Sequence, residues 1–328
     1  MTEISSREVG RLQHLQIVVK EETPLLPRVA FALITVASLA GAVFTGHGLG
    51  VSGPWLFVRW FGLWTAALAG GFLVWRLCYL RAAEKDLDEA TVTAYNDTAL
   101  RHADLVGRTL APLVALGATA PFAAGYLDNR PSLRWLIAAA MLGLAAMLAA
   151  GVRRTGVAAT AALLVVVIVA GWARADAGGG VYDWIRLAHL SAFSLWLGGA
   201  LWNIAVAMPA GRANPTIDAV IAGARQLDRF RWVVRVALPT IIGTGLAMAD
   251  VYRGLPGSWW LHYPGALILM KVGVIVALVV VFIACPLFRQ CSPVRGVCNI
   301  DDLRGADQAD QADQAAQADQ AGEPASSR

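Results

Sequence analysis

The stretch from Asp183 to Met208 has the residue types and spacing that most clearly allow chemistry, because it contains His189. The stretch is long and apolar enough to cross a bilayer. A helix over 183–208 would place His189 about six residues, or roughly 9 Å, below one end. An ionisable side chain at that depth is costly to insert and is by default a candidate functional residue. The pair Gly198-Gly199 would then let a neighbouring helix approach closely.

Four further side chains are predicted to lie on or near the same, outer side of the membrane. His47 sits between two glycines, His262 precedes the last apolar segment, and Met248 and Met270 lie in the outer halves of the last two segments. Imidazole and thioether ligands together favour copper, and thioether selects Cu(I). The sequence therefore predicts a copper site built from His189, His47, His262, Met248 and Met270. No carboxylate-rich cage or thiolate cluster is predicted there, which argues against calcium and structural zinc.

Each of these residues also has a structural interpretation, which the sequence leaves open. A single membrane histidine can simply hydrogen-bond a neighbouring helix, and the other two histidines can be ordinary loop residues. Methionine often fills irregular gaps in apolar cores. The metal hypothesis depends on all five side chains converging on one side of the membrane.

Asp250 and Lys271 are predicted to form an ion pair between the last two helices. A lysine inside a membrane almost always pairs with another group or faces water. A gate or a proton-coupled step is the functional alternative to a structural pair.

The elements that must position these residues are membrane helices. The chain has 328 residues, of which 57% are hydrophobic and only 15% charged, against roughly 25% charged in soluble domains. The predicted fold class is therefore all-α, a polytopic integral membrane helical bundle of about eight transmembrane helices. The expected segments are 28–45, 55–80, 103–127, 133–151, 155–173, 183–208, 232–252 and 264–288. A nucleic-acid partner is not expected, because no RNA- or DNA-binding motif is present.

The distribution of positive charge predicts the orientation. With the N-terminus inside, 20 of the 27 Lys and Arg residues fall in cytoplasmic regions and 6 at the outer ends, while Lys271 lies within the last helix. Short loops rich in Lys and Arg stay in the cytoplasm. Both termini are therefore expected to be cytoplasmic, in the plasma membrane. The largest inner loops are predicted at 81–102 and 209–231, with a short charged surface helix over 82–89.

Four regions follow from this pattern. Residues 1–27 form a cytoplasmic N-terminal segment, and 28–182 hold about five transmembrane helices. Residues 183–288 form a core of about three helices, and 289–328, rich in Ala-Asp-Gln repeats, form a disordered cytoplasmic tail. The cysteines lack a C-x-x-C spacing and are expected to be reduced thiols.

Several motifs in order resemble the copper resistance protein D (CopD) family. They are Leu187-Ala188-His189, Trp196-Leu197-Gly198-Gly199, Thr244-Gly245 and Leu269-Met270-Lys271. The resemblance covers roughly residues 183–288 and implies a plasma-membrane protein of eight helices involved in copper uptake or tolerance. The resemblance implies that His189 is the histidine of the copper site. It also implies an extracytoplasmic copper-binding partner of the CopC type, beside the lipid bilayer itself.

The predicted function is that of a copper-handling permease rather than an enzyme. No P-loop is present, so ATP-driven pumping by this chain alone is not expected. One alternative is a haem-binding redox subunit, since helical bundles hold haem through axial histidines. A non-catalytic membrane anchor or assembly factor is the other.

Overall fold

A computed structural model describes residues 25–125, 127–177 and 179–284 of the chain. Within these ranges every regular element is helical, which confirms the predicted all-α polytopic bundle. Seven helices are long and apolar enough to cross a membrane. The predicted segments 1–27 and 289–328 fall outside the described residues, except that α2 begins at Leu25. The helices and their bounds are α2 (Leu25–Gly48), α3 (Trp55–Cys78), α4 (Glu89–Gly117), η1 (Ala120–Gly125), α5 (Pro131–Ala150), α6 (Thr155–Ala177), α7 (Val181–Trp202), the π-helix η2 (Asn203–Ala207), α8 (Met208–Ala213), α9 (Ile217–Ala249), η3 (Asp250–Tyr252), α10 (Gly257–Leu261) and α11 (Ala266–Ala284).

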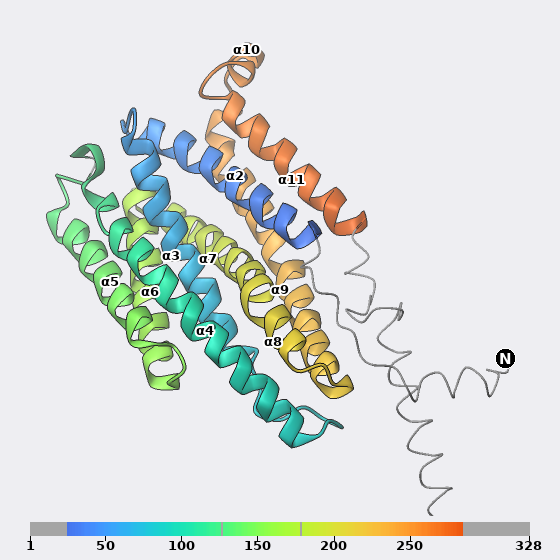
Figure 1. Cartoon of the computed structure of the whole chain (residues 1–328). Helices are drawn as coiled ribbons and strands as arrows, with labels where there is room; N and C mark the ends of the chain where they lie inside the picture. The colour runs from blue at the N-terminus through green and yellow to red at the C-terminus, as the bar shows by residue number, and fades with distance from the viewer. Residues whose placement is uncertain (1–24, 126, 178, 285–328) are drawn as a thin grey trace, which may run out of the picture.

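The eighth predicted segment, 264–288, corresponds to α11. The part of α11 with described side chains and apolar character, Ala266–Val280, is shorter than the other seven spans. Figure 1 shows α11 lying alongside α2, on one side of the bundle. We call the end of the bundle that carries α10 the α10 end, and the opposite end, which carries residues 79–88, the loop end.

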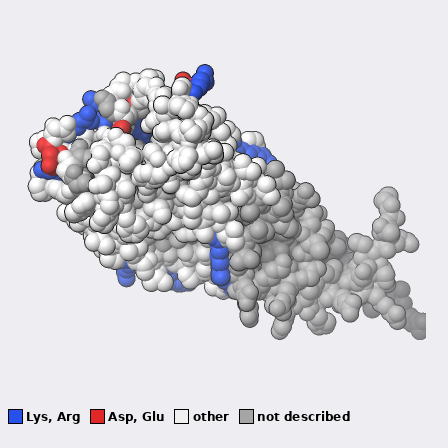
Figure 2. Space-filling view, turned by 90° about the horizontal axis from the view of Figure 1, so that it is seen from above, with Lys and Arg blue, Asp and Glu red and all other residues white. Residues whose placement is uncertain are grey.

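The outside of the bundle is apolar where a bilayer would surround it. Leu105, Leu142, Leu163 and Val236 are more than half exposed although they lie on different helices. Figure 2 shows one face on which most of the described surface carries no charged side chain. Large apolar side chains exposed on several helices are typical of a surface that faces lipid rather than water.

Helix α3 forms the centre of the bundle and packs most closely against α7. A Cβ atom added to Gly71 would lie 1.9 Å from the carbonyl oxygen of Ser194, and one added to Gly198 would lie 2.2 Å from the backbone nitrogen of Phe72. The Ser194 hydroxyl also donates to the carbonyl of Ala67 at 2.6 Å. The close approach predicted from the Gly198-Gly199 pair is therefore confirmed. This contact joins the predicted 28–182 and 183–288 regions into one packed bundle.

Two helices begin well before their predicted membrane segments. Helix α4 starts at Glu89 because the side chain of Asp88 accepts a hydrogen bond from the Thr91 backbone N–H at 2.8 Å. Hydrogen bonding from Thr91 also lowers the pKa of the Asp88 carboxyl. Helix α9 starts at Ile217, with Thr216 as its N-cap. Much of the two predicted inner loops, 81–102 and 209–231, is thus helical.

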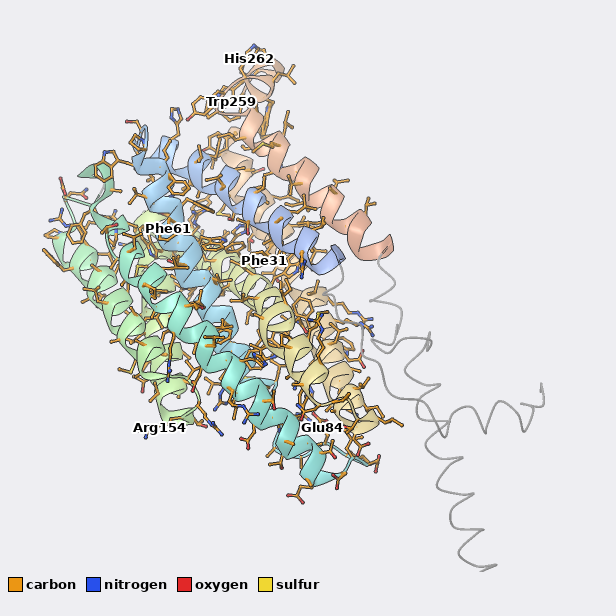
Figure 3. The ribbon with its side chains drawn as sticks, viewed as in Figure 1. Phe31, Phe61, Glu84, Arg154, Trp259 and His262 are labelled. Atoms are coloured by element: carbon orange, nitrogen blue, oxygen red, sulfur yellow. The ribbon has the colours of Figure 1, made fainter. Side chains whose placement is uncertain are left out.

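The predicted surface helix over 82–89 is wrong, because residues 82–88 form an irregular strap. Its Glu84 side chain is almost fully buried and pairs with both Arg229 and Arg225 of α9. Figure 3 places Glu84 at the loop end, the same end as Arg154. These tertiary ion pairs hold the strap against α9 and replace a local helix.

Candidate functional site

A cavity lies among α2, α3, α7, α9 and α11, in the half of the bundle nearer the α10 end. Its volume is about 500 Å³. The walls are mainly apolar, and their aromatic members are Phe44, Trp60, Trp64, Phe193 and Trp196. A cavity of this size and character is typical of a small-molecule or cofactor site.

His189 lines this cavity from α7 and is 7% exposed. Its Nδ1 atom lies 2.9 Å from the hydroxyl oxygen of Thr244 on α9. The Thr244 hydroxyl is itself close to the carbonyl oxygens of Thr240 and Ile241, to which its only proton can be donated. We therefore assign the His189 tautomer that has its proton on Nδ1, and this N–H donates to the Thr244 hydroxyl oxygen. The Nε2 lone pair is then left available as an acceptor or a metal ligand.

Met248 lines the same cavity, so two of the five predicted ligands share one cavity. Its sulfur lies 3.7 Å from Nη1 of Arg186, which donates to it. The two ligand types that favour Cu(I) thus line one cavity, although neither belongs to a preformed cluster of metal ligands. Within the described part of the chain, no group of three or more His, Cys, Asp or Glu side chains is placed to hold a metal ion.

The other three predicted ligands lie away from the cavity. The Met270 side chain is 45% exposed on the outside of α11. The exposed His47 ring packs edge-on against Tyr263, with centroids 4.9 Å apart. The His262 Nδ1 donates to the carbonyl of Ser258 at 2.7 Å, and Figure 3 shows His262 at the tip of the α10 end. The five predicted ligands therefore do not converge on one point in the described structure.

The predicted ion pair between Asp250 and Lys271 is absent from the described structure. Asp250 instead pairs with Arg253, with a separation of 2.6 Å between Oδ1 and Nη2, and both side chains are largely exposed. Lys271 lines the cavity, and its Nζ lies 3.0 Å from the position that a Cβ on Gly41 would occupy. The absence of a side chain at Gly41 therefore makes room for the ammonium group.

A buried ion network beside the cavity was not predicted. The Asp176 carboxylate, 1% exposed, lies 2.5 Å from Arg59 and 2.7 Å from Arg186. Arg59 also donates to the carbonyl of Ala42 at 3.0 Å, which ties α3 to α2. The sequence signal was present, because all three charged residues fall within the apolar ends of helices, where an ionisable group needs a partner. Their partners could not be paired without knowing which helices are neighbours.

The fold and this cavity define the class of the protein as an all-α, multi-pass membrane protein with a mainly apolar internal cavity that also has basic side chains in its walls. No family model, curated protein or solved structure matches the chain.

Proposed function

We propose that this protein handles copper in the plasma membrane, admitting Cu(I) to the cavity that His189 and Met248 line. The observation that carries the proposal is that the His189 imidazole and the Met248 thioether line one buried cavity. Nitrogen and thioether ligands of this kind suit Cu(I). The hydrogen bond from Nδ1 to Thr244 is the support from a neighbouring group that a metal-binding histidine commonly has.

Transit fits the charges of the cavity better than permanent storage does. Arg186 and Lys271 also line the cavity, and their positive charges oppose a resident cation. A permease needs binding that is weak enough for release. The proposal includes a CopC-type copper-binding partner as the donor at the α10 end, which would then face away from the cytoplasm.

Copper accumulation in cells tests this proposal with variants of matched chemistry. We expect His189→Ala and Met248→Leu to reduce accumulated copper several-fold at equal protein level. His262→Ala and Met270→Leu remove the same chemical groups outside the cavity and should leave accumulation unchanged. Equal accumulation in all four variants would contradict the proposal.

Haem binding is the second candidate function, and one observation favours it. The aromatic walls, the single buried imidazole and the two cationic side chains would suit a flat apolar ring with acidic substituents. His189 fits the role of one axial ligand through Nε2, whereas Met248 is already in contact with Arg186. An absorption spectrum of the purified protein decides between the candidates, since a haem band that is lost in His189→Ala would support haem.

A further inference from the structure

The walls of the cavity carry a positive charge that the copper proposal does not explain. Among its lining residues, the charged ones are Arg186 and Lys271, and neither Asp nor Glu is present. Arg186 shares the Asp176 carboxylate with Arg59. Lys271 has no hydrogen-bond or ion-pair partner within the described ranges. A membrane lysine without a counter-charge is costly, so an anion from outside the chain would stabilise it.

The cavity also has a mouth toward the surrounding lipid. Leu246 of α9 and Val272 and Val276 of α11 line the cavity, yet they are 65%, 49% and 57% exposed. Helix α11 packs along α2 rather than along α9, which leaves the α9 and α11 surfaces apart. Side chains that face both the cavity and the apolar exterior mark a lateral opening between these two helices.

Both cations lie near the α10 end of their own helix. Arg186 follows Val181 by five residues and Lys271 follows Ala266 by five, so each lies roughly 8 Å below the start of its helix at the α10 end. Long basic side chains bury their stems in apolar surroundings and direct the charged group toward the polar headgroups.

We propose that the cavity binds an anionic membrane lipid, whose acidic headgroup pairs with Lys271 and Arg186 and whose hydrocarbon chain lies along the apolar walls. The lipid enters through the mouth between α9 and α11. A free hydrophilic anion such as phosphate would have to cross the same apolar mouth without a hydrocarbon chain to offset its desolvation. This inference does not rest on the copper proposal, because it uses neither His189 nor Met248.

The lipid that co-purifies with the full chain tests this inference. The protein is reconstituted with equal amounts of phosphatidylglycerol and phosphatidylcholine, purified in detergent, and its retained lipid is measured by mass spectrometry. We expect wild type to retain mainly phosphatidylglycerol, and Lys271→Gln to retain about tenfold less of it, as the loss of a charged hydrogen bond implies. Lys271→Arg should keep the lipid, and Val276→Trp, which obstructs the mouth without changing charge, should lower its retention.

Matched controls separate this inference from the alternatives. Lys85→Gln removes the same charge at the loop end and should leave lipid retention at the wild-type level. His262→Ala, which removes an imidazole outside the cavity, should also leave it unchanged. Copper accumulation is a separate readout, so that failure of the copper proposal is distinguishable. Equal retention of the two lipids, or equal phosphatidylglycerol retention by wild type and Lys271→Gln, would overturn the inference. Displacement of the lipid by inorganic phosphate alone, or a haem band in the purified protein, would overturn it as well.

Discussion

The Asp176 carboxylate accepts ion pairs from two arginines that come from different helices, Arg59 of α3 and Arg186 of α7. All three side chains are mostly or fully buried. Coulomb interactions are strongest where water is excluded, and so is the cost of leaving a charge without its partner. This carboxylate therefore holds the position of Arg186 at the cavity wall as well as the packing of α3, α6 and α7.

Replacing Asp176 by Asn should destabilise the fold by about 3–5 kcal/mol, because it removes a buried carboxylate that pairs with two buried guanidinium groups. The free energy of unfolding in mixed detergent micelles measures this loss. Asp250→Asn is the matched control, since Asp250 pairs with Arg253 near the surface. Exposed pairs contribute only about 0–1 kcal/mol. Similar losses in the two variants would contradict the role that we give to Asp176.

Predictions for single residues succeeded where they depended only on the free-energy cost of an ionisable group inside the membrane. They failed where they depended on which side of a helix the residue lies. His189 was expected to be a candidate functional residue because of its depth, and it lines the cavity. Met270 and Lys271 are adjacent, so they point roughly 100° apart around α11. When Lys271 faces the cavity, Met270 turns toward the exterior. The Asp250 prediction was wrong because similar depth does not imply contact, and Arg253, one turn away, offers a nearer partner.

At the scale of elements, the crossing of α3 and α7 sets the geometry of the site. Gly71 and Gly198 allow the two backbones to touch, and the Ser194 hydroxyl adds a hydrogen bond to the α3 backbone. Small residues permit such close packing in membranes, where dispersion contacts must replace the hydrophobic effect. His189 stands about two and a half turns before Gly198 on the same helix, so this contact fixes how far His189 lies from α9 and α11.

Gly198→Ala should destabilise the protein by about 1–3 kcal/mol or more, because the new methyl group would overlap the α3 backbone. Gly243→Ala tests the same chemical change on α9, where nothing lies within 4 Å of the added atom. There the substitution should stabilise the helix by about 0.5–1 kcal/mol, since alanine loses less backbone entropy than glycine. Unfolding in mixed micelles should show opposite signs for the two variants. A loss of equal size in both would contradict the packing account.

The helix boundaries show what a hydropathy pattern can and cannot predict. Apolar runs of about 20 residues identified the spans, because a bilayer core requires that length. The early starts of α4 and α9 were missed because their first turns are charged and lie outside any apolar run. The N-cap residues Asp88 and Thr216 carried the missing signal. The strap between α3 and α4 was mistaken for a helix because its ion pairs are made to a distant segment.

At the scale of the whole molecule, the charged loops and the aromatic turn lie at opposite ends. Figure 3 shows Glu84 and Arg154 at the loop end and Trp259 and His262 at the α10 end. Arg225 and Arg229 of α9 also lie at the loop end, where they pair with Glu84. Basic loops remain in the cytoplasm, while tryptophan gathers at membrane interfaces. This arrangement predicts that the cavity opens nearer to the outer surface, where a copper donor would deliver its ion.

Single cysteines placed at the two ends test this orientation. In a variant whose four native cysteines are replaced by serine, Ser258→Cys should react with a membrane-impermeant maleimide on intact cells. Lys85→Cys, exposed in the strap at the loop end, should react only after the cells are permeabilised. The reverse pattern would place the cavity nearer the cytoplasm, and copper would then meet His189 on its way out of the cell rather than on its way in. Labelling of both positions from one side would contradict the membrane-spanning bundle, because the helices between the two ends are long enough to cross the bilayer.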